Sequence, residues 1–108
     1  MTKKTLGNHL TRKLESILTT VGEQIRTARL RRDLTVATVA ERASCSPLTI
    51  AKVEKGAPTV AMGIYARVLF AIRLEDDLLQ LAKDDKMGRL IQDLKIKERK
   101  RASKRKGL

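Results

Sequence analysis

The sequence predicts an all-α protein, and three observations support that fold class. Apolar residues recur three and four positions apart, as they do on helices, and no alternating segment is long enough for a strand. Only Tyr65 and Phe70 are aromatic among 108 residues, so the core has to consist of Leu, Ile, Val, Ala and Met, which helices accommodate. Residues that start or stop helices lie between the apolar segments.

Residues 1–19 are predicted to form an N-terminal amphipathic helix. Its apolar positions are Leu6, Leu10, Leu14, Ile17 and Leu18. Thr20 and Glu23 match a capping box, in which a hydroxyl and a carboxylate satisfy amides at a helix start, so a second helix is expected from Val21 to near Asp33. The residues expected to point inward are Val21, Ile25 and Ala28, and those expected to point mostly outward are Arg26, Arg29, Arg31 and Arg32.

Residues 34–56 predict two short helices joined by a tight turn. Thr35 can cap the first helix, whose apolar positions are Val36, Val39, Ala40 and Ala43. The small residues 44–46 suit the turn. Ser46 followed by Pro47 predicts the next helix start, because serine accepts a hydrogen bond at the N-cap and proline lacks an amide that would be unpaired there. This helix is expected to run through Lys55, with Gly56 in the left-handed conformation that closes it.

Two further helices and a last apolar patch are expected in residues 57–94. One helix is predicted to open at Pro58 and Thr59, with Gly63 permitting close packing. Its apolar positions are Val60, Ile64, Val68, Ala71 and Ile72. Glu75, Asp76 and Asp77 suit the positive end of the next helix, which is expected to bury Leu78, Leu81 and Ala82. After an interruption at Gly88, the residues 84–94 carry a patch of Leu90, Ile91 and Leu94.

The charge is strongly basic and unevenly distributed. Lys and Arg number 24 against 12 Asp and Glu, which gives a net charge of +12 and favours a polyanionic partner. Residues 95–108 hold eight of the basic residues and one acid, so this tail carries +7 and the rest of the chain +5. A block of like charge repels itself, and the tail is therefore predicted to be disordered.

The two short helices and their turn define a helix-turn-helix unit. The unit resembles the lambda-repressor/Cro (Xre) type of DNA-binding domain at Leu34, Thr35, Val39, Ala40, Ser46, Thr49, Ile50, Val53, Glu54, Lys55, Gly56 and Pro58. The resemblance covers residues 21–82 and implies a five-helix lambda-repressor-like domain, assigned to residues 20–83, with an extra N-terminal helix and a basic C-terminal tail. Val36, Ser44 and Arg73 depart from it, standing where Gln, Gly and Gly are usual. Ser44 would have to adopt a left-handed backbone at a cost of about 1 kcal/mol.

A narrower resemblance lies in residues 74–101. The acidic run at Leu74–Leu78, the pair Asp84 and Asp85, the Gly88-Arg89 step and the basic end are similar to the HipB-like group of regulators. This resemblance implies a transcriptional repressor that regulates its own toxin-antitoxin operon and binds a HipA-like kinase toxin. Other Xre regulators end in similar acidic helices, so a stand-alone Xre regulator is the alternative.

In a helix-turn-helix motif, the second helix presents its first turns to base edges in the major groove. Helical spacing puts Ile50 and Val53 inward, which leaves as base-reading candidates Pro47, Leu48, Thr49 and Lys52. Lys52 suits guanine O6 and N7, whereas Leu48 and Pro47 suit a thymine methyl group. Candidates for phosphate contacts flank this helix and are Arg31, Arg32, Thr35, Ser46 and Lys55. One module is a weak reader, so a homodimer on a double-stranded DNA operator is expected.

Catalysis and metal binding find no support in the sequence. Cys45 and His9 are the only cysteine and histidine, which excludes a disulfide framework and a Cys/His zinc cluster. No Gly-rich phosphate loop or metal-ligand spacing occurs, so no cofactor is expected. Without an apolar run of membrane-spanning length or a secretory signal, the expected location is the cytoplasm, with no membrane association. Cys45 is expected to fill a small buried slot rather than to sense redox state.

Several alternatives stay open. The domain could be a helical bundle without a nucleic-acid role, in which Leu48 belongs to the core. It could also be a protein-interaction module whose DNA surface is vestigial, or an architectural protein that packs unrelated nucleic acids with similar affinity. The apolar stripe of the leading helix could serve packing, a dimer seam or a toxin groove. The acids between Glu75 and Asp85 could cap a helix or attract a basic partner. The tail could be merely solvated or could contact phosphates.

Overall fold

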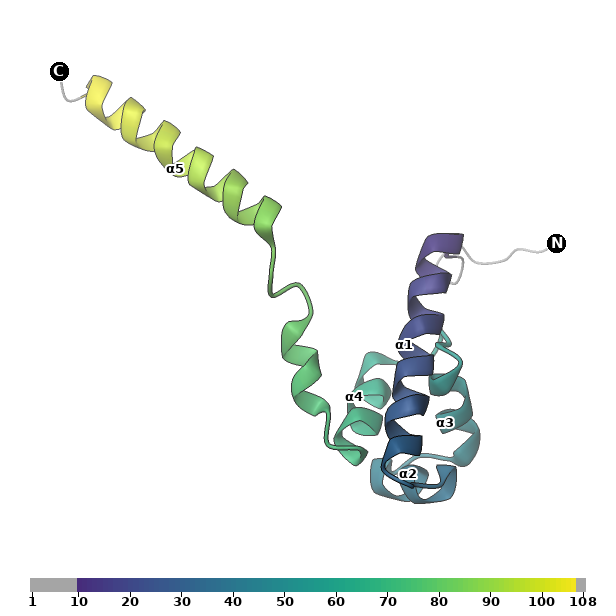
Figure 1. The fold of residues 1–108 in the computed structure, drawn as a ribbon. Coiled ribbons are helices and arrows are strands. Elements are labelled where there is room, and N and C mark those ends of the chain that lie inside the picture. Colours follow the sequence, from purple (N-terminus) through teal and green to yellow (C-terminus); the bar gives the residue numbers. More distant parts are fainter. Residues whose placement is uncertain (1–9, 107–108) are drawn as a thin grey trace. The chain divides into compact units, whose positions relative to one another are not determined.

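The computed structural model describes residues 10–106, and this part of the chain is helical without a strand. The elements are α1 (Arg12–Arg31), α2 (Val36–Ala43), α3 (Pro47–Glu54), α4 (Met62–Ala71), the 3-10 helix η2 (Glu75–Gln80) and α5 (Lys86–Lys106), drawn in Figure 1. The predicted all-α helix-turn-helix fold is confirmed. Leu6 and His9, which the sequence assigned to the leading helix, lie outside the described residues.

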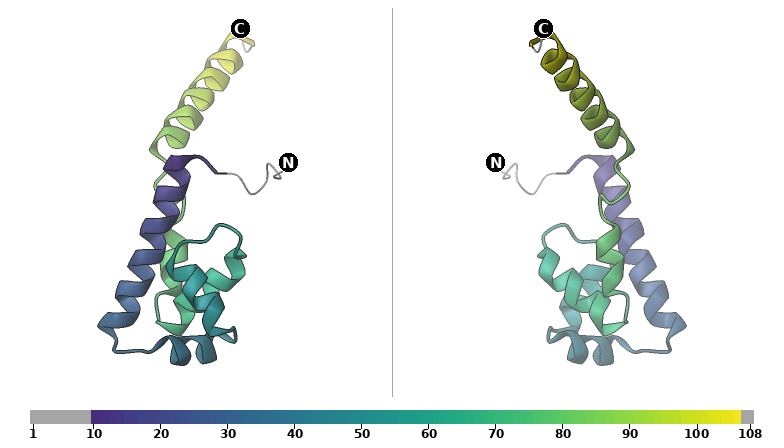
Figure 2. Two further views of the ribbon diagram at one scale, coloured as in Figure 1. Left: turned by 90° about the vertical axis from the view of Figure 1, so that its right-hand side faces the viewer. Right: turned by 90° about the vertical axis from the view of Figure 1, so that its left-hand side faces the viewer.

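The chain divides into two units, the first ending at Asp76 and the second starting at Asp77. Within the first unit, α2 packs against both α4 and α3, and α1 packs against α3. Figure 2 shows these four helices from two sides, with the first turns of α1 extending beyond the other three. Leu14 and Ile17 on those turns are about half exposed, so the apolar stripe of α1 continues past the core.

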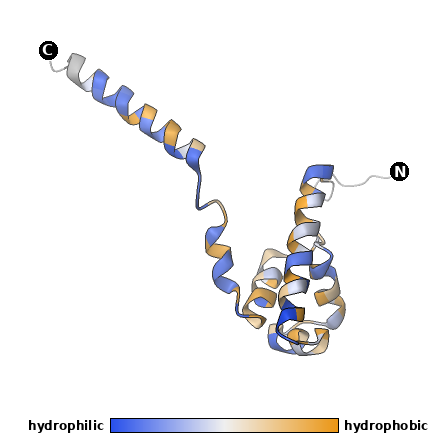
Figure 3. Ribbon diagram, in the orientation of Figure 1, coloured by the Kyte–Doolittle hydropathy of each residue, from blue (hydrophilic) through white to orange (hydrophobic). Residues whose placement is uncertain are grey.

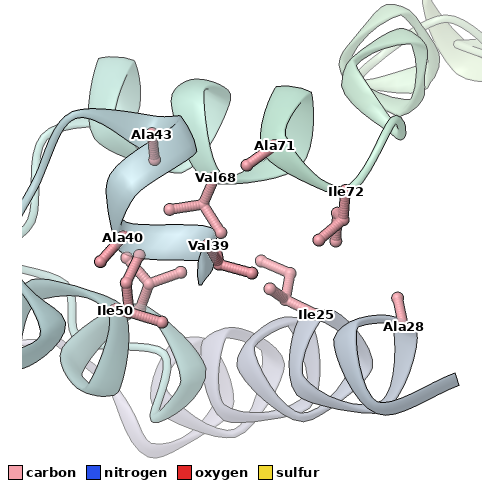
Figure 4. Packing of buried hydrophobic residues seen from close by; sticks show 10 residues of the cluster. Ile25, Ala28, Val39, Ala40, Ala43, Ile50, Val68, Ala71 and Ile72 are labelled. Carbon is pink, nitrogen blue, oxygen red and sulfur yellow. The ribbon is translucent and has the colours of Figure 1, made fainter. Parts of the chain in front are cut away.

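The core of the first unit is built from aliphatic side chains of all four helices, as the composition predicts. Its fully or nearly fully buried members are Ile25, Ala28, Val39, Ala40, Ala43, Ile50, Val53, Val68, Ala71 and Ile72. In Figure 4, Val39 of α2 lies between Val68 of α4 and Ile25 of α1. Tyr65 adds a polar link to this core, since its hydroxyl donates to the Ala57 carbonyl at 2.7 Å and burial raises the pKa of its phenol.

The predicted break between a leading helix and a second helix at Thr20 is wrong. One helix of 20 residues runs from Arg12 to Arg31, and both members of the supposed capping box, Thr20 and Glu23, are exposed on its surface. The cap lies earlier, where the Thr11 hydroxyl accepts from the Leu14 amide at 3.2 Å. No proline interrupts the segment, so the hydrogen-bonded ladder continues through it.

The helix predicted to open at Pro58 starts later, at Met62. Residues 58–60 form a turn instead, and Ala61 precedes the helix without a side-chain cap. The following segment forms the 3-10 helix η2 rather than an α-helix, and the predicted burial of its end is wrong because Leu81 is 59% exposed and Ala82 is exposed.

In the second unit, residues 86–106 form one helix, where the sequence predicted a short apolar segment and then a disordered tail. Gly88 does not interrupt α5 but sits in its first turn, where its amide donates to the Asp85 carboxylate at 3.0 Å. Lys, Arg, Glu and Ala all have high helix propensity, and the segment 89–106 has no Gly or Pro. The helix propensity of these residues therefore outweighs the repulsion between their charges. Figure 3 shows α5 as mainly hydrophilic, with hydrophobic bands in its first half.

Two glycines bring α1 and the end of α3 into backbone contact. A Cβ at Gly22 would lie 2.5 Å from the Gly56 nitrogen and 2.7 Å from the Glu54 oxygen. A Cβ at Gly56 would overlap the Leu18 carbonyl, and Gly56 has the predicted left-handed backbone, with φ of 74°. The expected close packing at Gly63 is wrong, because a Cβ there would meet nothing within 4 Å.

The glycines make a matched pair for a stability test. Gly22→Ala forces α1 away from the Glu54–Gly56 backbone, and we expect a loss of about 1–3 kcal/mol of unfolding free energy. Gly63→Ala fills open space at an exposed position in the first turn of α4, and we expect a gain of about 0.4–1 kcal/mol because alanine restricts the unfolded chain. Urea denaturation followed by circular dichroism measures both. Equal effects of the two substitutions would contradict the close approach of α1 and α3.

Candidate nucleic-acid interface

The turn between α2 and α3 has the tight geometry that the sequence predicts. Ser44 caps α2 with φ 56° and ψ 47°, the left-handed conformation expected from its place in the motif. The Cys45 amide donates to the Ala40 carbonyl at 3.0 Å, which satisfies a carbonyl at the end of α2. Cys45 itself is half-buried against the core, in agreement with the expected slot. The turn thus fixes the direction in which α3 leaves α2.

The start of α3 also follows the prediction. The Ser46 hydroxyl accepts from the Thr49 amide at 3.1 Å and lies 2.9 Å from the Thr49 hydroxyl, and Pro47 occupies the first helical position. The two hydroxyls therefore hold each other in place at the helix end.

The two faces of α3 differ sharply in exposure. Ile50 and Val53 are completely buried, whereas Leu48 is 65% exposed and Lys52 is exposed. Pro47 is also exposed and Thr49 is half-buried. The interpretation of Leu48 as a core residue is therefore wrong. An exposed leucine beside an exposed lysine on the first turns of a short helix gives a surface that can contact both a methyl group and an acceptor.

The flanking residues lie at helix ends. Thr35 caps α2, and its hydroxyl accepts from the Thr38 amide at 3.0 Å. Lys55 is the exposed C-cap of α3, and Arg31 is the exposed last residue of α1. Arg32 is exposed but donates from Nη1 to the Ala28 carbonyl at 2.9 Å, so one arm of its guanidinium is held by its own helix.

An ion pair that the sequence did not reveal fixes α3 to α1. Arg29, predicted to point mostly outward, is only 7% exposed. Its Nε and Nη2 donate to the two carboxylate oxygens of Glu54 at 2.6 and 3.1 Å, and its Nη1 donates to the Leu34 carbonyl at 2.9 Å. The hydrogen bond to Glu54 raises the pKa of the Arg29 guanidinium above its ordinary value, and burial opposes this. The two partners are 25 residues apart, so no local sequence pattern indicates that they pair.

The part of the chain that the structure describes contains no cluster of His, Cys, Asp and Glu suited to a metal ion. Among residues 10–106, no helix is long and apolar enough to cross a membrane.

Comparison with known families matches the same region. A family model described as "Helix-turn-helix domain" matches residues 20–82, more than half of the chain. The match contains α2, the turn, α3, α4 and η2, whereas the first turns of α1 and all of α5 lie outside it. Among curated proteins, none matches the chain.

Breaking the buried ion pair should cost far more than breaking an exposed one. Glu54→Ala leaves the Arg29 guanidinium buried without its carboxylate, and we expect a loss of about 3–5 kcal/mol of unfolding free energy. The Arg89–Asp84 pair is the control, because its side chains are 59% and 68% exposed. Asp84→Ala should change stability by less than about 1 kcal/mol.

A double variant distinguishes the contribution of the two charges to stability from the contribution of side-chain packing. Arg29→Met with Glu54→Leu removes both charges, so it should be clearly more stable than Glu54→Ala alone. Chemical denaturation provides the measurement for all three proteins. If Glu54→Ala proved as mild as Asp84→Ala, the pair would not hold α3 in place.

Proposed function

The chain belongs to the helix-turn-helix domain family, and from this membership we propose that it is a sequence-specific transcriptional repressor. The family match supports a DNA-binding regulator, and the proposal adds the mode of action. The observation that carries it is the two-faced α3, buried through Ile50 and Val53 and exposed at Leu48 and Lys52. A helix anchored in this way can enter the major groove without losing its packing.

In the proposed complex, few side chains read bases. Lys52 donates to guanine O6 and N7, and Leu48 and Pro47 contact thymine methyl groups. Thr49 reaches a base with the hydroxyl that also touches Ser46. Because α3 lacks the Asn and Gln that grip adenine, DNA shape supplies part of the specificity.

The phosphate contacts in the proposal come from helix ends on either side of α3. They are assigned to Arg31, Arg32, Thr35, Ser46 and Lys55. The exposure of Arg31 and Lys55 supports this role, since a lysine or arginine must reach outward to neutralise a phosphate. These contacts would orient the domain without selecting a sequence.

We further propose that the working form is a homodimer that regulates a toxin-antitoxin operon and binds a HipA-like kinase toxin. One eight-residue reading helix supplies few contacts, which favours two copies on two half-sites. The half-exposed Leu14 and Ile17 on α1 favour a protein partner, because exposed apolar residues that continue a core commonly mark an interface. A stand-alone regulator would use the same residues only for dimerisation.

Alanine substitutions on α3 test the reading surface. Duplexes selected by the wild-type protein from a randomised pool provide the operator. We expect Leu48→Ala and Lys52→Ala each to weaken binding of this duplex by about 1–3 kcal/mol, with little change for unrelated duplexes. Fluorescence anisotropy measures the affinities.

Arg26→Ala is the matched control, because Arg26 is an exposed cation of α1 outside the assigned set. This substitution should leave the affinity for the selected duplex unchanged. A double Leu48→Ala, Lys52→Ala variant that keeps its sequence preference would refute the assignment and favour the protein-interaction module.

Charge substitutions on α5 test whether the basic helix contacts phosphates. The changed residues, all to Gln, are Lys95, Lys97, Arg99, Lys100 and Arg101. Glutamine keeps the helix propensity, so we expect weaker binding of every duplex and a slope of log K against log salt concentration that is shallower by up to about 4.5.

The opposite substitution supplies the control for α5. Glu98→Gln removes an acid from the same helix and should steepen the salt dependence slightly. Anisotropy at a series of salt concentrations gives both slopes. If neither slope moved, α5 would be a solvated helix without a role in DNA binding.

A further inference from the structure

We propose that a groove between α2 and α4 binds an acidic protein segment that carries an apolar side chain. Two shallow hollows, of about 420 and 360 Å³, meet at Arg42 and Phe70. The first is also lined by Ser44 and Arg67, and the second by Arg73. We call these two hollows the α2–α4 groove. It contains no residue of α3, so this proposal does not depend on the DNA-reading surface.

The charge of the groove is uncompensated. Arg42, Arg67 and Arg73 are all exposed, and the ion pairs found in the described part of the chain involve Arg29 and Arg89 instead. Arg42 donates from Nη1 only to the Ala71 carbonyl, at 3.4 Å. Arg42 lines both hollows, Arg67 lines the first and Arg73 the second, so each hollow has two arginines that retain most of their donors for an anion.

The exposed aromatic ring beside the arginines favours a carboxylate-bearing protein. The planar fork of arginine matches a carboxylate or a phosphate with two hydrogen bonds, so the ring is what distinguishes the two. Phe70, the only phenylalanine of the chain, is 56% exposed. Phenylalanine and arginine are both enriched in protein–protein interfaces, where the ring fills the dry centre and the guanidinium groups hold the rim.

A DNA backbone fits the same surface less well. Phosphates do not cover an aromatic ring, so contact with duplex DNA would leave the exposed Phe70 without an apolar partner. None of the residues assigned to base or phosphate contacts lines the groove. The two surfaces therefore share no residue, and the groove differs in carrying an exposed aromatic ring.

The backbone at Arg73 adds a second line of support. Arg73 has φ of 65°, a conformation that favours glycine, and it directly follows Ile72, the C-cap of α4. The backbone conformation therefore does not account for an arginine at this position, and a strained residue at a surface hollow is consistent with a function of its side chain. Arg73 lines the groove.

This strain makes a sharp test possible. Arg73→Gly relieves the left-handed backbone, which offsets the entropy that glycine adds to the unfolded chain, so the variant should stay folded and yet weaken binding of an acidic ligand. Asp33→Gly is the matched control, since Asp33 is exposed, has φ of 58° and does not line the groove. It should stay folded without losing affinity.

The probe is a fluorescein-labelled short peptide in which Asp and Glu flank a central Leu-Phe pair. Comparison peptides replace the acids by Asn and Gln, or the Leu-Phe pair by Ser-Ser. The full chain should bind the acidic peptide at least about tenfold more tightly than either comparison peptide. Arg73→Gly and the pair Arg67→Ala, Phe70→Ala should each lose about tenfold, whereas Arg26→Ala should lose nothing.

Because α5 is also basic, the binding site has to be located directly. Backbone amide shifts of the labelled full chain should move in residues 42–44 and 66–73 when the acidic peptide is added. Shifts confined to residues 86–106, or equal binding of the neutral peptide, would overturn the proposal. So would Arg67→Ala, Phe70→Ala variants that lose affinity for duplex DNA but keep the peptide, since the groove would then serve the DNA backbone.

Discussion

The attachment of α3 to α1 is the constraint on which the rest of the first unit depends. An eight-residue helix is too short to be stable alone, so its position has to come from tertiary contacts. Two kinds of contact supply it: the backbones meet where Gly22 faces Gly56, and the buried Arg29 guanidinium grips both oxygens of Glu54. The same guanidinium holds the Leu34 carbonyl, so one side chain joins α1, the loop before α2 and the end of α3.

This attachment explains why the outer face of α3 can be left so exposed. Ile50 and Val53 provide the apolar anchor, and the ion pair and glycine contact fix the helix end, so Leu48 and Lys52 are not needed for packing. Residues that are not needed for the stability of the fold can instead be suited to binding a ligand. The rigid turn at Ser44, held by the Cys45 amide, sets the angle at which that face is presented.

Local signals in the sequence were sufficient for the central part of the fold. Thr35, Ser46 with Pro47, and Gly56 each act within a few residues, and each has its predicted role. The Arg29–Glu54 pair could not be predicted, because its partners are far apart in sequence and arginine on a helix usually faces solvent. The capping box at Thr20 failed because a locally valid start signal carries no weight inside a helix already begun at Thr11.

The basic residues of the first unit also differ in role, according to where the fold places them. Arg29 is buried and paired with Glu54, Lys52 and Lys55 are exposed on α3 and at its C-cap, and Arg42, Arg67 and Arg73 line the two hollows that share the exposed Phe70. Net charge alone would assign all of them to nucleic acid, yet a buried guanidinium paired with a carboxylate adds nothing to the field outside. The basic composition is therefore not evidence for one polyanion: Arg29 stabilises the fold, and different ligands are proposed for the exposed cations of α3, of the α2–α4 groove and of α5.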